Sequence, residues 1–423
     1  MAQDKLFFNR DTRVFVRLGD YVWEVPVLDG FSFSQATNAT EVTLNEMDNA
    51  TTGSRRARQM FNDSYAPAEW SFSTYARPRF ASSHDRSCEE VLWALLAGPA
   101  AWDDTNKDFE DASGNIYLGQ GDIGGSAANY QEINFSKSNT STLGTADIYF
   151  VLGANNVVNA QTEAQAGNLL AYKIEGCVVN EMSFDFDVEG LATLNWSGFG
   201  TIIKEVGIDA LSSAPSSSEI GDVWVTPSTD GNSNAPVVKI AKTANHATVY
   251  TSETTEAELI DEDTFVRNKL SFLTMVDSTD SVTYSVVATG GNITVNNNIT
   301  FVTPETLGVV NQPLGHVTGT RTVSGNVTCY LGAHNTAATR SADLFEDLIE
   351  DTSNITQNFA ITLNVGGEPG QSSQGPCLSF IMPKCHVEIP THSFEDVISL
   401  ETNFHALPTN VDSADELEVR YAG

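Results

Sequence analysis

The segment Ser183–Glu189, which reads SFDFDVE, decides the fold class of this chain. Apolar and acidic residues alternate strictly along it, and a period of two is the signature of an extended strand with two different faces. One face is expected to pack against a core and the other to carry a stripe of carboxylates. The apolar positions are Phe184, Phe186 and Val188, and the acidic positions are Asp185, Asp187 and Glu189.

The rest of the chain has the same β texture. Short runs rich in Val, Ile, Thr and Phe are separated by Asn, Gly, Ser and Asp, which is typical of an antiparallel sandwich or barrel. Trp70–Phe72 and Leu191–Trp196 are predicted as further strands of the sheet that contains Ser183–Glu189. The predicted fold class is therefore mainly β.

Composition limits the function. The 423 residues suffice for two or three domains, and 22 Lys and Arg against 55 Asp and Glu give a formal net charge of -33. Affinity for nucleic acid or anionic lipid depends on clustered cations, so this balance argues against both kinds of partner. Two interpretations of the acid excess stay open: it keeps the protein soluble, or it repels a neighbouring polyanion.

Cysteine usage indicates the compartment. Five cysteines are few and odd in number for a chain of this length, so a disulfide framework is not expected. The first fifteen residues lack the apolar core of a signal peptide, and the stretch Val91–Trp102 is too short to span a bilayer. A soluble protein made in a cytoplasm, without membrane contact, is expected.

Two helices are predicted, with the same internal spacing. In the first, Ser87 is expected to be the N-cap and Glu90 to complete a capping box. The second is expected to follow Ser341. The apolar stripes are Val91, Leu92, Leu95 and Leu96 in the first helix, and Leu344, Phe345, Leu348 and Ile349 in the second.

The segments after the two helices also correspond, which predicts an internal duplication. Each helix is followed by a strand that reaches a cysteine (Cys177 or Cys385), then an acidic segment, then a final strand. The predicted domains are a first module at 1–207 with a loop-rich insert at about 101–167, a linker or small β insert at 208–264, and a second module at 265–423. Each module is expected to be an antiparallel β-sandwich or barrel with one flanking helix.

Catalytic chemistry is not evident. There is no phosphate-binding glycine loop, nucleophile elbow or dinucleotide fingerprint. Cys385, His386, Glu388 and His392 are close in sequence, but alternation on a strand places Cys385 and His386 on opposite faces, which disfavours a shared metal. Paired carboxylates such as Asp185 and Asp187 could serve a glycosidase, yet nothing marks one of them for a raised pKa. No catalytic, cofactor or metal site is predicted, and the chain is not expected to be an enzyme.

One basic spot interrupts the acidic background. Arg55, Arg56 and Arg58 lie within four residues in the loop 49–59. Either the charges are solvated and incidental, or the guanidinium groups meet carboxylates on a neighbouring subunit in an assembly contact.

Three stretches resemble the tail-tube (major tail) proteins of tailed bacteriophages. They are YVWEVPVLDGFSFSQ at 21–35, APAEWSFSTY at 66–75 and GLATLNWSGFG at 190–200. The resemblance covers most of residues 1–207 and, more faintly, 265–423. It implies a β-sandwich with a flanking helix whose sheets join between subunits into an inner barrel.

The resemblance also implies an assembly. Single modules form hexameric rings, and duplicated modules form trimeric, pseudo-hexameric rings that stack through a long loop. By position that loop is 49–65 here, which contains the three arginines, and its counterpart is 303–321. Implied partners are further copies of the chain, a tape-measure protein and tail completion or baseplate proteins. Double-stranded DNA is expected to pass through without specific binding, in a virion tail assembled in the host cytoplasm.

The acidic stripe acquires a role in such a tube. A conduit for DNA should not bind phosphate, and carboxylates in the lumen would repel the backbone. Asp185, Asp187 and Glu189 are therefore predicted to face the lumen. The alternative is a modular β-sandwich surface or adhesion protein that binds a carbohydrate or a receptor.

Overall fold

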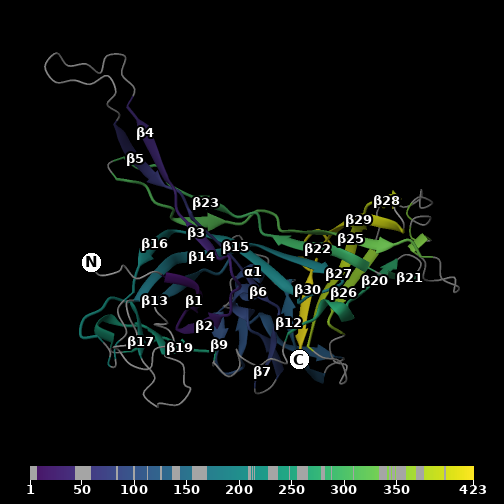
Figure 1. The fold of residues 1–423 in the computed structure, drawn as a ribbon, viewed down its shortest axis with the longest axis horizontal. Helices are drawn as coiled ribbons and strands as arrows, with labels where there is room; N and C mark the ends of the chain where they lie inside the picture. Colours follow the sequence, from purple (N-terminus) through teal and green to yellow (C-terminus); the bar gives the residue numbers. More distant parts are fainter. Residues whose placement is uncertain are drawn as a thin grey trace.

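The computed structural model describes residues 7–42, 59–81, 84–98, 101–111, 113–123, 126–135, 143–154, 169–207, 211, 213, 215–226, 237–246, 248–254, 265–277, 282–286, 288–307, 309–332, 341–342, 344, 348, 359–367, 376–394 and 397–423. The described chain is mainly antiparallel β structure, which confirms the predicted fold class. Two β bodies lie side by side along the longest axis, and a hairpin projects from one of them (Figure 1).

The first half has two layers. In the first, called the outer layer below, β1 pairs with β2 on one side and β13 on the other, and β13 pairs with β14. The 19-residue strand β14 then crosses into a second layer, where its C-terminal part pairs with β15. In that second layer β15 pairs with β6, and β6 pairs with β3. The bounds are β1 (Phe7–Leu18), β2 (Tyr21–Val25), β3 (Ser32–Ser34), β6 (Ala68–Tyr75), β13 (Ala146–Ala154), β14 (Leu169–Asp187), β15 (Thr193–Gly200) and β16 (Ile202–Glu205), which also pairs with β14.

The second half has strands with the same order of pairing. Their order of pairing is β21-β20-β26-β27-β29-β25-β22, which matches β2-β1-β13-β14-β15-β6-β3 in the first half. Strand β28 also pairs with β29. The bounds are β20 (Phe272–Asp277), β21 (Val282–Val286), β22 (Ala288–Asn296), β25 (Thr322–Tyr330), β26 (Phe359–Val365), β27 (Cys377–Val387), β28 (Thr391–Phe394) and β29 (Ile398–Ala406).

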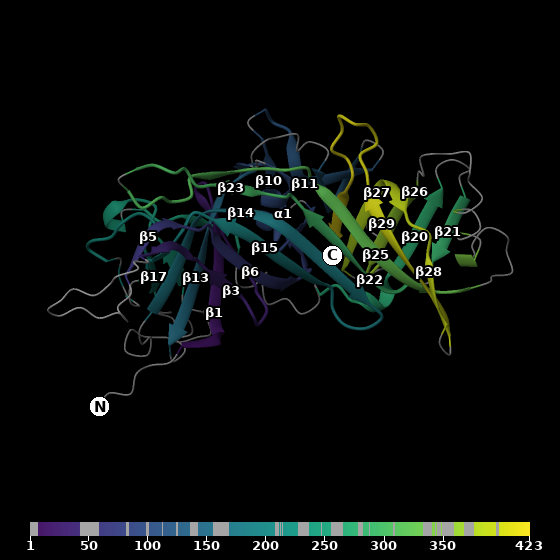
Figure 2. The ribbon, with the colours of Figure 1, turned by 90° about the horizontal axis from the view of Figure 1, so that it is seen from above.

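A continuous sheet joins the two halves. The C-terminal part of β14 pairs with β22 over seven residue pairs, from Glu181 opposite Asn296 to Asp187 opposite Gly290. The strand order β3-β6-β15-β14-β22-β25-β29-β28, called the shared sheet below, therefore runs through both halves without a break (Figure 2). One face of this sheet packs on a common apolar core that includes Phe184 and Phe380, whose rings stack at 5.2 Å.

The described part of the stretch predicted as a loop-rich insert, 101–167, contains five strands. The last, β13, belongs to the outer layer, and the other four form a sheet that continues into the second half, because β12 pairs with the C-terminal strand β30 and β30 pairs with β27. The bounds are β9 (Ala101–Asp103), β10 (Asp108–Glu110), β11 (Ile116–Ile123), β12 (Ser126–Asn134) and β30 (Glu418–Ala422).

Residues 208–264, predicted as a linker or small β insert, contribute a short hairpin that covers the outer layer of the first half. Val223, Val225 and Ile240 pack with Phe15 and Tyr149 in a second apolar cluster. The elements are β17 (Val223–Thr226), β18 (Val237–Ile240), the 3-10 turn η3 (Ala244–His246) and β19 (Thr251–Ser252), which runs parallel to β2.

The first helix is present, but its predicted capping box is wrong. Helix α1 (Glu90–Ala97) has Glu89 at its N-cap position and no side-chain cap, because Ser87 ends a strand and hydrogen-bonds Gln131 instead. All eight residues of α1 are buried rather than a single stripe, since strands of the 101–134 region cover its second side.

At the second predicted helix, residues 341, 342, 344 and 348 are helical, with Leu344 and Leu348 in the core. Phe345 and Ile349 lie outside the described residues.

The remaining short elements are paired locally. They are β4 (Thr37–Glu41) with β5 (Met60–Tyr65), β7 (Pro78–Ala81) with β8 (His84–Ser87), β23 (Thr300–Val302) with β24 (Gly315–Val317), and the 3-10 turn η5 (Asn268–Leu270). The β4–β5 hairpin is the projection in Figure 1 and is called the arm below. Within the described ranges, no helix has the length and apolar character needed to cross a membrane.

Candidate functional site

The structure places the predicted acidic stripe on the solvent side of the shared sheet. Asp185 and Asp187 are exposed on β14, while Phe184 and Phe186 are buried on the opposite face. The alternation ends earlier than predicted, because β14 ends at Asp187 and the chain turns there. The backbone N–H of Glu189 donates to Asp187 Oδ1 at 2.8 Å, so Glu189 belongs to the turn. Val188, predicted to be packed, is 44% exposed for the same reason.

The same face is polar across the whole shared sheet, which sequence reasoning did not foresee. Directly opposite residues on neighbouring antiparallel strands share a face, so the pairings define rows that cross the sheet. The row through Asp185 runs Tyr75, Thr193, Asp185, Asn292, Asn326, Asn403. The adjacent rows contain Ser73, Asn195, Ser183, Thr294, Ser324 and His405 on one side, and Asp187, Thr328, Glu401 and Thr391 on the other. These residues, with Glu181, Asn296, Glu69, Ser71, Ser197, Ser32 and Ser34, are called the polar face.

Asparagine side chains donate hydrogen bonds to several carboxylates on or beside this surface. Asn296 Nδ2 donates to Glu181 Oε2 at 2.6 Å, and Asn195 Nδ2 donates to Asp185 Oδ2 at 3.4 Å. At the second-half end, Asn403 Nδ2 donates to Glu388 Oε2 at 2.8 Å. These donors are neutral, so they orient the carboxylates without cancelling their charge.

Cations are missing from these strands. The described strands β3, β6, β15, β22, β25 and β29, and the β14 segment 181–187, contain neither Lys nor Arg. A surface with several carboxylates and no cation produces a negative potential that repels phosphate. The polar face is thus suited to pass a polyanion without binding it.

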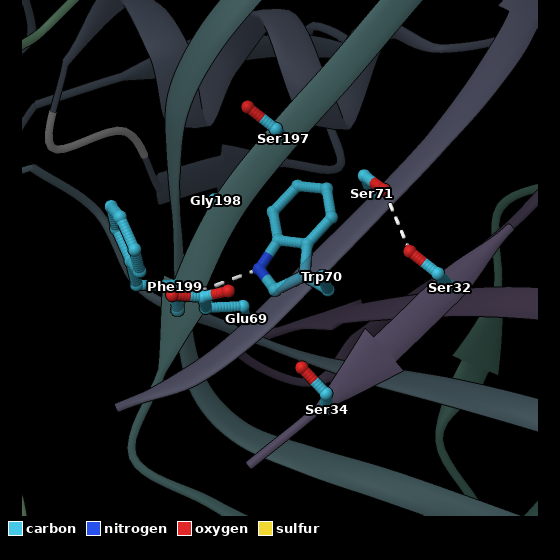
Figure 3. A pocket seen from close by; sticks show the side chains of 8 residues that line it. All are labelled: Ser32, Ser34, Glu69, Trp70, Ser71, Ser197, Gly198 and Phe199. Atoms are coloured by element: carbon cyan, nitrogen blue, oxygen red, sulfur yellow. Dashed lines mark hydrogen bonds between the residues drawn. The ribbon is translucent and has the colours of Figure 1, made fainter. Parts of the chain in front are cut away.

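A shallow hollow of about 340 Å³ lies on the polar face beside β3 (Figure 3). Its lining is mainly serine hydroxyls, with Glu69 as the charged group, and the indole N–H of Trp70 donates to the carbonyl of Phe199 at 3.4 Å. The lining contains a single carboxylate, so it does not offer a pair of carboxylates. Its residues are Ser32, Ser34, Glu69, Trp70, Ser71, Ser197, Gly198 and Phe199.

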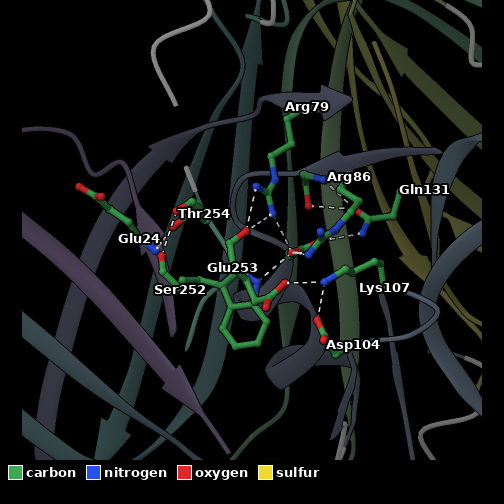
Figure 4. A network of polar contacts seen from close by, with 12 residues as sticks. Glu24, Arg79, Arg86, Asp104, Lys107, Gln131, Ser252, Glu253 and Thr254 are labelled. Atoms are coloured by element: carbon green, nitrogen blue, oxygen red, sulfur yellow. Dashed lines mark hydrogen bonds and ion pairs between the residues drawn. The ribbon is translucent and has the colours of Figure 1, made fainter. Parts of the chain in front are cut away.

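A buried ionic cluster joins several elements of the first half (Figure 4). The carboxylate of Glu90, fully buried, accepts hydrogen bonds from Arg86 Nε at 2.8 Å and Arg79 Nη2 at 3.2 Å. Trp23 Nε1 and Gln131 Nε2 also donate to it, at 2.9 and 3.2 Å. Burial alone would raise the pKa of Glu90, but the charges of Arg86 and Arg79 bring that pKa below its ordinary value. One carboxylate therefore ties together α1, β2, β7, β8 and β12.

The linker region is attached to the same cluster. Arg79 Nη1 donates to the carbonyl oxygen of Glu253 at 3.3 Å, and Lys107 Nζ lies 3.2 Å from Glu253 Oε2. Removing one member of a buried ion pair typically costs about 3–5 kcal/mol, because the partner is left as an uncompensated charge. Both carboxylate oxygens of Glu90 accept hydrogen bonds from side chains of this cluster, which indicates a structural role.

A second buried carboxyl group anchors the C-terminal strand. Tyr421 Oη donates to Glu89 Oε1 at 2.6 Å and accepts from Trp93 Nε1 at 3.0 Å. Burial raises the pKa of Glu89 to about 8, although the hydrogen bond from Tyr421 opposes that shift. At neutral pH Glu89 is therefore largely protonated.

The arm carries the predicted assembly loop. Arg55, Arg56 and Arg58 lie outside the described residues, so their contacts stay a prediction. The strand that follows them exposes Met60 and Phe61. The second-half segment predicted as the counterpart runs along the base of the arm, where Tyr65 N donates to the carbonyl of Asn311 at 2.9 Å and Asn311 N donates to that of Asp63 at 3.1 Å.

The possible metal ligands lie apart. Cys385 is buried in the core of the second half, whereas His386 is exposed on the other face of β27. Across the residues that the structure describes, no three His, Cys, Asp or Glu side chains group as a metal site.

The fold is mainly β, and its polar face belongs to one sheet that runs through both halves. No protein-family model matches the chain. The chain is 28% identical over 417 residues to the tail tube protein pb6 of Escherichia phage T5. The matched region covers 96% of this chain and 74% of that protein. This similarity confirms the predicted resemblance to phage tail-tube proteins and supports a structural role in a virion tail.

Sequence reasoning missed the second-half part of the polar face, although a signal was present. The segment 292–296 reads NITVN and alternates polar and apolar residues as Ser183–Asp187 does. Its polar residues are uncharged, so it does not stand out by charge.

The pH dependence of stability should reveal the state of Glu89. Its pKa in the folded protein, about 8, exceeds the ordinary 4.5, so folding keeps a proton that the unfolded chain loses. This group's stabilisation is complete below pH 4.5 and falls by about 1.4 kcal/mol per pH unit as the pH rises to 8. Glu89→Gln, which stays neutral, should gain stability relative to the unmodified protein across that window.

The measurement is urea unfolding at pH 5 to 9, with exposed Glu219→Gln as the control that should show no such trend. A difference between Glu89→Gln and the unmodified protein that is constant with pH would contradict a protonated Glu89.

Proposed function

We propose that this chain polymerises into the tube of a phage tail and that the polar face lines the channel through which DNA is ejected. The observation that carries the proposal is a sheet face that spans both halves, holds oriented carboxylates and contains no Lys or Arg. A lumen of this kind leaves the DNA hydrated and avoids the phosphate contacts that would slow its passage.

The proposed building block is a trimeric ring in which each chain supplies two tail-tube modules, 1–207 and 265–423. The matched pairing order of the two halves supports the duplication. A further correspondence is that Cys177 and Cys385 are both buried, with each thiol directed at the carbonyl oxygen three residues earlier, at 3.3 and 3.9 Å. Two modules per chain give a trimer six similar units around its axis.

The other proposed partners follow from the tube. They are further rings of the same chain, a tape-measure protein within the lumen during assembly, and tail completion or baseplate proteins at the ends. The proposed location is the virion tail, with assembly in the host cytoplasm. The relative's name, tail tube protein, supports self-assembly but specifies none of these partners.

The lumen assignment can be tested by thiol labelling. Asp185→Cys lies on the polar face, and Val237→Cys lies on the exposed hairpin that covers the outer layer. In assembled tubes a maleimide on a long polyethylene glycol chain should modify Val237→Cys and leave Asp185→Cys largely unmodified, because the reagent is too large to enter the channel freely.

Unassembled protein is the control, and both variants should react there. Protection of Val237→Cys together with free reaction of Asp185→Cys in tubes would place the polar face outside and overturn the assignment.

The inter-ring role of the arm can be tested by charge reversal. Replacing Arg55, Arg56 and Arg58 by Glu should leave rings intact and prevent their stacking, because guanidinium–carboxylate contacts between rings become repulsive. The control reverses Lys204, Lys239 and Lys242, which gives the same change in net charge on the body of the first half. Negative-stain electron microscopy distinguishes rings from tubes; tubes of normal length from the arm variant would exclude these arginines as stacking contacts.

A further inference from the structure

The shared sheet ends in two strand edges. Among the described residues β3 pairs only with β6, and β28 pairs only with β29. The two strands belong to different halves and lie well apart in both views (Figures 1 and 2). Open edges offer backbone donors and acceptors to another strand, so they mark where a second chain can add.

The junction inside the chain is a template for how these edges meet. There the C-terminal part of β14, next to β15, pairs with β22, next to β25. At one open edge, β28 pairs with β29 in the way that β14 pairs with β15. At the other open edge, β3 pairs with β6 in the way that β22 pairs with β25. The edge of β28 therefore has the position that β14 has at the junction, and the edge of β3 has the position of β22.

The side chains on the core side agree with a missing neighbour at β28. Within the junction Phe186 is 5% exposed, and β22 passes so close that a Cβ on Gly291 would lie 2.6 Å from its ring. Its counterpart Phe394 is 76% exposed. A strand added beside β28 would cover the ring of Phe394 as β22 covers Phe186.

We propose that β28 of one subunit pairs antiparallel with β3 of the next, in the register set by the β14–β22 junction. This inference rests on the proposed function, because it identifies the contact that closes the ring. Repeated head to tail, one such contact generates a closed ring when the rotation closes, and it continues the polar face from subunit to subunit.

The register follows from matched rows. At the β28 end, Ser393 lies opposite Ser399, which lies opposite Tyr330; at the junction, Asp185 lies opposite Thr193, which lies opposite Tyr75. Ser393 thus corresponds to Asp185.

The β3 side is matched in the same way. In the second half, Asn292 lies opposite Asn326, and Asn326 precedes Tyr330 by four residues. In the first half, Ser32 lies opposite Ser71, and Ser71 precedes Tyr75 by four residues. Since Asp185 lies opposite Asn292 at the junction, Ser393 should lie opposite Ser32 of the partner subunit, and Thr391 opposite Ser34 of the partner subunit.

Disulfide cross-linking tests this register. The double variant Ser32→Cys/Ser393→Cys should, after assembly and mild oxidation, yield a covalent trimer on a non-reducing gel that returns to monomer on reduction. Both serines are exposed, and all five natural cysteines are buried, so disturbance and background should be small. The double variant Asp185→Cys/Asn292→Cys calibrates the chemistry, because it should form the same kind of bridge within one chain.

The register control is Ser34→Cys/Ser393→Cys. Its two positions would be diagonal neighbours, whose Cα atoms are about 7–8 Å apart and too distant for a relaxed disulfide. It should therefore cross-link at least several-fold less than Ser32→Cys/Ser393→Cys.

The outcomes separate the two claims. Tubes that form normally without a cross-link at the 32/393 pair, or with a stronger one at the 34/393 pair, would overturn the proposed contact and leave the tube function standing. If the 185/292 bridge forms and no variant assembles under any condition, the tube function fails and the contact fails with it.

Discussion

Seven residue pairs between β14 and β22 hold the architecture together, since they turn two similar β bodies into one sheet. The 19 residues of β14 make this possible, because its first part belongs to the outer layer and its last part to the shared sheet. Across the junction Phe184 stacks on Phe380, so the two halves share an apolar core as well as backbone hydrogen bonds. Burial of each such aromatic side chain contributes about 1.5–3 kcal/mol. The polar face exists only because this junction aligns the rows of both halves.

A second connection also links the two halves. The C-terminal strand β30 pairs with β12 of the first half and β27 of the second. Its Tyr421 reaches Glu89 at the start of α1, next to the Glu90 cluster that also binds β2, β8 and the linker. Two separate links between the halves resist a hinge motion that one link would allow.

Much of the fold could be predicted from local pattern. The alternation in Ser183–Asp187 identified the strand and its two faces, and the hairpin at Val223–Ile240 could be foreseen from short β-branched runs. Long-range choices could not be predicted. Ser87 looked like a cap because Glu90 follows at the right spacing, but its actual partner, Gln131, is 44 residues away and Glu90 binds two arginines. Likewise, nothing local shows that β30 bridges the halves, and the alternation on β22 does not stand out because its polar residues are uncharged.

The central claim is that this chain closes into a ring whose inner wall is the polar face. Helical reconstruction by cryo-electron microscopy, applied to tubes grown from the purified full chain, tests it most directly. We expect three chains per ring, one continuous inner barrel, and Asp185 and Asp187 directed at the channel. Six chains per ring, or an inner wall formed by the outer-layer strands β1 and β13, would contradict the account.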